Sequence, residues 1–281
     1  MSKIHQPLCE TTFDGARTRL AMLTAEQCPP LRLHRIAHVG LADAAVPFQR
    51  VRLQPGGSCV LVSISGGGKI LLDGRWQQCR ASTACLAPPR VLNAFHAVPG
   101  RRWRICWVRY DEPAGIRPVV SAASPVKARC DARIMACAIE GLMAESAGRA
   151  DARLEHHWIE LVHAESQRLA RPWHLNDRLW QVWRKVEDNL AAGWSVRELA
   201  SLAHCSEEHL RRLCLRELGR SPMQQLTSIR MQRAAELLER TDDKLEVIAG
   251  AVGYANAFVL SRVFKKWIGR NPSEYRRGRR A

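Results

Sequence analysis

Six side chains near the C-terminus are of types that can pair with the edges of DNA bases, and they form two groups about fifty residues apart. The groups are Glu208, Arg211 and Arg212, and then Phe258, Ser261 and Arg262. Arginine pairs with guanine, glutamate with the cytosine amino group, phenylalanine with the thymine methyl group, and serine with either kind of base. Lys265 and Lys266 follow the second group and are expected to contact phosphates, which position a protein without specifying sequence.

An internal repeat favours two of these residues over the others. At an offset of 49 to 50 residues, the stretch 195–275 matches itself at several positions, including Leu210 with Leu260, Arg212 with Arg262, Gly219 with Gly269 and Pro222 with Pro272. Self-similarity at a fixed period indicates a repeated supersecondary unit. A single exposed arginine on a helix is usually only solvated, so the shared position of Arg212 and Arg262 is what indicates base reading.

Each copy of the repeat has the layout of a helix-turn-helix, with a short helix, a tight turn and a longer helix that ends at glycine. Ser195 and Glu198 form a capping-box pattern that starts the first unit. The pattern predicts one helix-turn-helix over 195–218 and a second over 245–268. A helix of about 17 residues between them would span roughly 26 Å, against roughly 34 Å between major-groove faces one turn apart.

The C-terminal part of the chain resembles the DNA-binding domain of the AraC/XylS family of bacterial transcription regulators. The matching stretches are WSVRELASLAHCSEEHLRRLCLRELGRSPMQQL, IRMQRAAELLE and IAGAVGYANAFVLSRVFKKWIGRNPSEYRR. The resemblance implies two helix-turn-helix subdomains on a long connecting helix, entering adjacent major-groove segments of double-stranded DNA with the six residues above as base readers. The chain departs from the family pattern at His204, Cys214, Leu215 and Gln225, where glycine, an aromatic residue, a basic residue and tyrosine are common.

Composition agrees with a nucleic-acid partner. The chain has 43 basic and 27 acidic residues, a formal net charge of +16, which favours a polyanion as partner. Its ten cysteines are scattered without a C-x-x-C pair, so neither a metal site nor a cofactor is expected. Because the sequence shows no signal peptide and no long apolar run, we expect a cytoplasmic protein that does not bind membranes.

Residues 1–120 contain short apolar or alternating segments separated by glycine and proline turns, which predicts a β-sandwich or barrel. The run Gly66-Gly67-Gly68-Lys69 is expected to form a hairpin turn rather than a phosphate-binding loop. This region weakly resembles the cupin-like effector-binding domain that often precedes an AraC-type domain. Small barrels can hold one ligand. Four aromatic residues are candidates to line such a site, with ordinary core packing as the alternative: Trp76, His96, Trp103 and Trp107.

Two amphipathic stretches, 129–146 and 151–169, predict a helical region over 126–170. These helices could mediate a homodimer, as in related regulators, or pack against the barrel of their own protomer. The segment 170–176 is predicted to be a linker. Asn176 or Asp177 then caps the first helix of the C-terminal domain, 177–281.

The sequence therefore predicts an α+β protein with a cupin-like β-barrel or sandwich, a helical linker region and an all-α domain with two helix-turn-helix subdomains. The function that fits is a sequence-specific transcription regulator, an activator by family resemblance, with a small molecule or partner as effector and RNA polymerase as a contact. The sequence contains no recognisable set of catalytic residues, so an enzyme is not expected. The alternatives are a cupin-type small-molecule enzyme with a helical appendage and a non-specific nucleic-acid binder.

Overall fold

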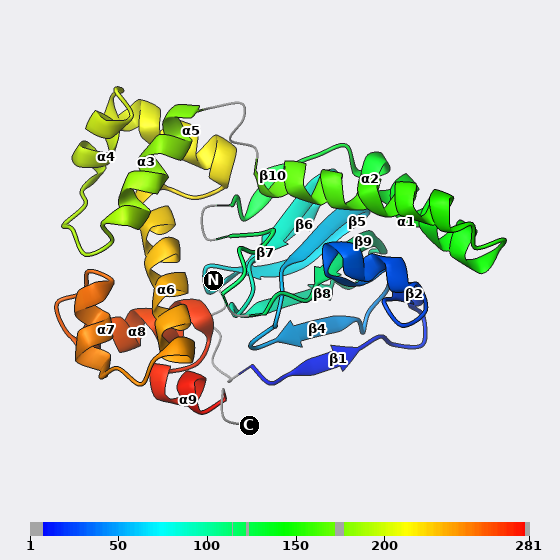
Figure 1. Ribbon diagram of the computed structural model, residues 1–281, viewed down its shortest axis with the longest axis horizontal. Helices are drawn as coiled ribbons and strands as arrows, with labels where there is room; N and C mark the ends of the chain where they lie inside the picture. Colours follow the sequence, from blue (N-terminus) through cyan, green and yellow to red (C-terminus); the bar gives the residue numbers. More distant parts are fainter. Residues whose placement is uncertain (1–7, 114, 122–123, 172–176, 279–281) are drawn as a thin grey trace.

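The computed structural model describes residues 8–113, 115–121, 124–171 and 177–278. The chain forms a β domain, followed by two long helices that pack against it, and then a helical domain that lies beside one end of the β domain (Figure 1). The predicted α+β fold class is confirmed, with strands confined to the N-terminal half. The expected linker, 170–176, falls mostly outside the described residues, as does Asn176.

The β domain is a curled antiparallel sheet, with ten strands in the described residues. The strands are β1 (Thr11–Phe13), β2 (Arg19–Thr24), β3 (Ile36–Ala44), β4 (Gln49–Arg52), β5 (Cys59–Leu72), β6 (Arg75–Arg80), β7 (Thr83–Ala87), β8 (Asn93–Ala97), β9 (Trp103–Tyr110) and β10 (Lys127–Arg129). The main path runs β1-β4-β8-β5-β9-β3-β2, while β6 pairs with β5, and β7 pairs with both β5 and β10. A 3-10 helix, Pro29–His34, connects β2 to β3.

The glycine run does not form the predicted hairpin turn. Strand β5 continues through it, pairing with β9 and β7 in its first part and with β6 and β8 in its second part. A Cβ atom on Gly68 would lie 2.2 Å from the Trp103 ring, and one on Gly66 would lie 1.9 Å from the Arg102 carbonyl oxygen. Glycine is needed here because another part of the chain packs against the strand. The turn comes later, at Asp73-Gly74, where both residues have positive φ angles.

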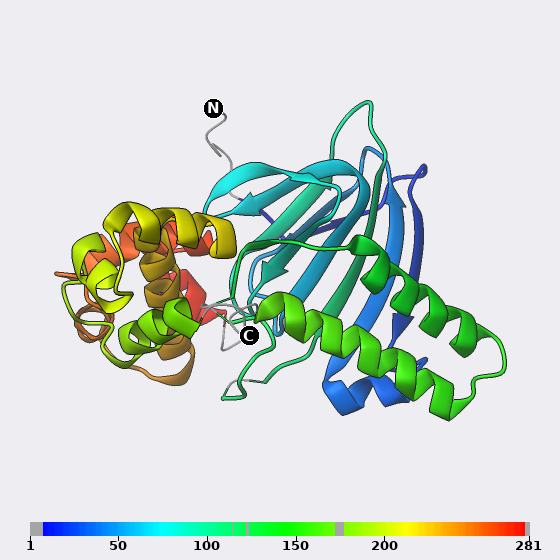
Figure 2. The ribbon, with the colours of Figure 1, turned by 90° about the horizontal axis from the view of Figure 1, so that it is seen from above.

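Two helices cover one face of the curled sheet, α1 (Ala132–Ala147) and α2 (Ala152–Ala170) (Figure 2). Asp131 and Asp151 cap them by accepting hydrogen bonds from backbone N–H groups of the first turn. Their buried sides share an apolar core with the outward side of β3, β5 and β9. A second core fills the inside of the curled sheet and includes Leu61, Phe48 and Trp103. The described helices include none long and apolar enough to cross a membrane.

The helical domain, called the reader below, consists of helices α3 to α9. They are α3 (Asp177–Asp188), α4 (Val196–Leu202), α5 (Glu207–Leu218), α6 (Pro222–Arg240), α7 (Leu245–Ala251), α8 (Ala257–Ile268) and α9 (Pro272–Arg277). Figure 1 shows α4 and α5 at one end of α6, and α7 and α8 at the other. Each group packs its own apolar core against α6, so one continuous helix spaces the two units.

The repeat appears in the structure as matched helix ends. Gly219 and Gly269 terminate α5 and α8 with φ angles of 70° and 86°, in the left-handed region that glycine enters at little cost. Ser221 with Gln224, and Asn271 with Glu274, then form capping boxes that start the next helices. Because these signals are local and occur in both copies, the sequence determines them strongly.

The turns inside the two units differ in one residue type. Gly253 follows α7 with φ of 77°, whereas His204 takes the corresponding left-handed conformation in the first unit, with φ of 49°. A side chain in this conformation costs about 1 kcal/mol or more. The departure at His204 therefore leaves the shape of the turn unchanged and lowers its stability.

Candidate DNA interface

The structure places the predicted base readers on the outer sides of α5 and α8. Leu210, Leu213 and Cys214 of α5 are buried, as are Leu260 and Phe264 of α8. The side chains opposite to them face solvent: Glu208, Arg211, Arg212, Phe258 and Arg262 are exposed, and Ser261 is half-buried. Ser206 and Asn256 cap the two helices through hydrogen bonds to the N–H groups of His209 and Val259.

The arginines of α5 are not equivalent. Arg211 lies 3.2 Å from a Glu207 carboxylate oxygen and 3.9 Å from one of Glu208, so its charge is already partly compensated on the helix surface. Within the described residues, neither Arg212 nor Arg262 has a carboxylate at ion-pair distance. The two arginines that the repeat singles out are thus the ones that are free to bind an external acceptor.

Phe258 is the most exposed large apolar side chain in the described residues, with 75% of its surface accessible. An aromatic ring at the start of a helix, pointing into water, gains nothing from packing and is available for an apolar contact with a thymine methyl group. Phe258 is therefore not packed into the core of its own unit. Leu215, where the family often has a basic residue, is also exposed.

The two lysines of α8 have different surroundings. Lys265 and Lys266 are both exposed, but the backbone at Lys266 touches the β domain. A Cβ atom on Gly74 would lie 2.5 Å from the Lys266 carbonyl oxygen, so the β5–β6 turn abuts the C-terminal end of α8. Lys265 is therefore better placed than Lys266 to approach a phosphate group.

An ion pair that sequence analysis missed joins the β domain to the reader. Asp73, in the β5–β6 turn, accepts three hydrogen bonds of 2.7–3.1 Å from the guanidinium of Arg220. The two side chains are only 11% and 9% exposed. Arg220 also donates to Gln225 at 3.4 Å, which explains a polar, fully buried glutamine at a position where the related domains often have tyrosine.

A second polar contact joins the two domains near α9. Arg90, between β7 and β8, pairs with Glu239 of α6 at 2.5 Å. The Tyr275 hydroxyl donates to the Arg90 carbonyl oxygen at 2.9 Å and to Glu239 at 3.0 Å. Burial and the Glu239 charge raise the pKa of Tyr275, which keeps the hydroxyl protonated as a donor. Both ends of α6 are thereby tied to the β domain.

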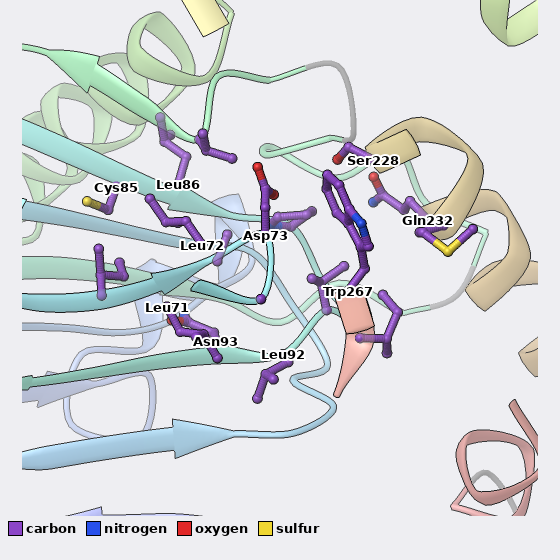
Figure 3. A pocket seen from close by; sticks show the side chains of 18 of the residues that line it. Leu71, Leu72, Asp73, Cys85, Leu86, Leu92, Asn93, Ser228, Gln232 and Trp267 are labelled. Carbon is purple, nitrogen blue, oxygen red and sulfur yellow. The ribbon is translucent and has the colours of Figure 1, made fainter. Parts of the chain in front are cut away.

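A cavity of about 50 Å³ lies between the two domains (Figure 3). Leu72, Asp73 and Cys85 line it from the β domain, and Ser228, Gln232 and Trp267 line it from the reader. The Gln232 side-chain oxygen is buried and has no hydrogen-bond partner among the described residues. The space is large enough for a few water-sized molecules, and the glutamine oxygen gives one of them an acceptor.

The four aromatic residues proposed as effector contacts do not meet in one place. Trp76 and His96 pack edge to face with ring centroids 4.8 Å apart. Trp103 is fully buried, and its indole N–H donates to Ser63 at 2.8 Å. Trp107 donates to His38 instead, at 3.0 Å. None of the four lines the cavity between the domains, and Trp103 has the surroundings of a core residue.

The contact between Trp107 and His38 predicts loss of stability in acid. The indole N–H donates to His38 Nδ1, and burial with the charge of Arg109 lowers the pKa of His38 to about 4. An unfolded histidine has a pKa near 6.5, so the stabilisation is complete above about pH 6.5 and is lost as the pH falls towards 4.

Replacing His38 by asparagine, whose side-chain oxygen can accept the same hydrogen bond, should reduce this acid sensitivity. The wild type is expected to lose roughly 2 kcal/mol more of its unfolding free energy than H38N does between about pH 7.5 and pH 5. Urea unfolding at the two pH values measures the difference. Equal losses would show that the pKa of His38 is the same in the folded and the unfolded protein. The pKa of His163 is also lowered to about 4. Its contribution to the loss of stability in acid is the same in the wild type and in H38N.

Comparison with known proteins agrees with this geometry. Residues 199–278 match the family model described as a helix-turn-helix domain. The RCS-specific HTH-type transcriptional activator RclR of Escherichia coli (strain K12) is 34% identical over 119 residues, which are 42% of this chain and 41% of that protein. A putative AraC-like transcription regulator of Streptomyces antibioticus is 37% identical over 87 residues, 31% of this chain and 29% of that protein.

Among solved structures, the C-terminal domain of AraT, a response regulator from Geobacillus stearothermophilus, is 34% identical, with 36% of this chain and 84% of that chain covered and a TM-score of 0.34. The alignments span less than half of the two curated relatives. Two helix-turn-helix units on one connecting helix define a DNA-binding domain of transcription regulators. More particularly, residues 199–278 form a helix-turn-helix domain that is similar to the one in AraC-like transcription regulators.

Proposed function

We propose that this chain is a sequence-specific transcription regulator, in which the reader recognises double-stranded DNA and the β domain receives the regulatory signal. The observation that supports this most strongly is the pair Arg212 and Arg262. They occupy equivalent positions in two repeated units, both are exposed, and both lack a carboxylate partner within the described structure. Such side chains are suited to bidentate pairing with guanine in the major groove.

The contacts between the domains indicate how a signal in the β domain would reach the reader. The β domain holds α6 near both of its ends, through Asp73 with Arg220 and through Arg90 with Glu239. A small molecule or partner that shifts the β domain would therefore change how the two helix-turn-helix units of the reader are presented to DNA. The proposal also includes activation through a contact with RNA polymerase. It further includes a homodimer that forms through the exposed sides of α1 and α2.

The experiment is selection of binding sites from a library of random duplex DNA with the full chain. At physiological salt, the selected duplex is expected to bind about 10³-fold or more tightly than a shuffled sequence of the same composition. The affinities of both duplexes should fall as salt rises, because phosphate contacts contribute to each. Equal affinity for the two would identify a non-specific nucleic-acid binder instead.

A further inference from the structure

Two cysteines meet inside the curled sheet of the β domain. Cys79 lies on β6 and Cys85 on β7, and their sulfur atoms are 3.4 Å apart. Both are buried in the core that fills the inside of the sheet. The strands that carry them pair with the two different parts of β5, so the thiols face each other across the bend in that strand.

We propose that Cys79 and Cys85 form a thiol–disulfide switch, oxidised by a peroxide, that alters the contact between the β domain and the reader. The sulfur atoms need to approach from 3.4 Å to about 2.05 Å for the bond to form.

The surroundings make one thiol the nucleophile and the other its partner. The hydrogen bond between the two thiols and the nearby Lys127 ammonium lower the pKa of Cys79, while the same hydrogen bond and burial raise the pKa of Cys85. Lys127 is held beside the pair, because its Nζ donates to the Gln78 carbonyl oxygen at 2.9 Å and its backbone pairs with Cys85. The thiolate is the form that attacks a peroxide.

The reaction balances with two thiols and one hydrogen peroxide. The Cys79 thiolate attacks one peroxide oxygen, the O–O bond breaks, and the departing hydroxide takes up a proton, leaving a sulfenic acid on Cys79. The sulfur of Cys85 then attacks the sulfur of Cys79, loses its proton and releases the hydroxyl group as a second water. Two thiols lose one electron each, and the peroxide is reduced to two waters.

The cavity between the domains brings a small oxidant next to the thiol pair. Cys85 contributes to its wall, and the Cys79 sulfur lies 3.4 Å from the Cys85 sulfur. Gln232 also lines it, and its side-chain oxygen has no hydrogen-bond partner among the described residues (Figure 3). Its volume of about 50 Å³ is enough for hydrogen peroxide, which is close to two water molecules in size. The molecule would enter from the boundary between the β domain and the reader.

The same strands carry the contacts between the domains. Strand β6 follows directly from the turn in which Asp73 binds Arg220 and Gly74 abuts α8. Strand β7 pairs with β10, and the residue before β10, Val126, donates its N–H to the Leu218 carbonyl oxygen at 3.0 Å. A bond that draws β6 and β7 together pulls on both contacts, so oxidation loosens the docking of the reader.

Peptide mapping of the full chain tests the chemistry. Trypsin cleaves after Arg75, Arg80 and Arg90, so Cys79 and Cys85 fall on separate peptides, WQQCR and ASTACLAPPR. After treatment with hydrogen peroxide and alkylation of the remaining thiols, these peptides are expected to appear as one linked species that dithiothreitol separates. The linked species should disappear in C79A and in C85A, and persist in C28A, which removes a buried cysteine elsewhere in the β domain.

Amide hydrogen exchange of the reduced and oxidised wild type tests the consequence, with C79A as the control. Exchange is expected to become several-fold faster in the β5–β6 turn, 70–76, and in the segment 218–226, with no change in C79A. The proposal is overturned if both thiols stay open to alkylation after the exposed Cys9 and Cys137 have been oxidised. It is equally overturned if the linked peptides form while exchange in both segments stays the same.

Discussion

Replacing Arg262 by alanine is expected to weaken binding to the selected duplex by about 5- to 150-fold, the equivalent of roughly 1–3 kcal/mol for one bidentate contact with guanine. The side chain is exposed and is not buried in the core of its unit, so the variant should fold normally. Binding to shuffled DNA at low salt should hardly change. Titration of both duplexes, with circular dichroism to verify folding, measures the effect, and R212A should behave in the same way at the other half of the site.

Two further variants separate base reading from charge. K265A is expected to weaken binding to all sequences alike and to lower the salt slope by about one. R101A removes an exposed arginine between β8 and β9 of the β domain, and should leave both affinities unchanged. If R262A instead lowers the affinities for selected and shuffled duplexes by the same factor, Arg262 contacts only phosphate and the assignment of base readers is wrong.

The helices of the reader were predictable because their signals are local. The capping residues, the terminal glycines and the apolar spacing lie within a few residues of one another, and each occurs in both copies of the repeat. Ser195 with Glu198 forms the predicted capping box, and Ser206 caps the next helix as its position indicated. The same spacing placed Arg212 opposite the buried Leu210 and Leu213, as the structure confirms.

The glycine run of β5 was misread because glycine has two structural uses that a single sequence does not distinguish. It supplies positive φ in turns, and it permits close approach of another part of the chain. The approach here is by Trp103 and Arg102, about 35 residues further along the chain. The pattern Asp73-Gly74 is also a turn signal, and there the chain does turn between β5 and β6.

The contact between the domains could not be predicted from periodicity. Asp73 and Arg220 are separated by 147 residues, and nothing in the pattern around Asp73 indicates what binds it. One signal was available: the repeat aligns Arg220 with Arg270, in the sequences GRSP and GRNP. Of these two arginines, Arg220 is the one that binds a carboxylate of the β domain, and that partner became evident only in three dimensions.

Replacing Asp73 by alanine is expected to uncouple the reader from the β domain. Arg220 would remain in an interface where it is 9% exposed, and an uncompensated charge in such a position costs about 3–5 kcal/mol. Separation of the domains returns the guanidinium to water and avoids that cost. In calorimetry, D73A should therefore show two unfolding transitions where the wild type shows one, and its radius of gyration in solution should increase.

A matched variant tests whether burial of the Asp73–Arg220 pair is the reason that its loss uncouples the domains. D43A removes the carboxylate of another bidentate pair in the β domain, with Arg102, but both side chains there are 40–49% exposed. Exposed pairs contribute little, so D43A should unfold as the wild type does. The double variant D73A/R220M removes both charges of the buried pair and should regain a single transition, because no unpaired charge remains at the interface. A single wild-type transition in D73A itself would mean that the Asp73–Arg220 pair does not hold the domains together.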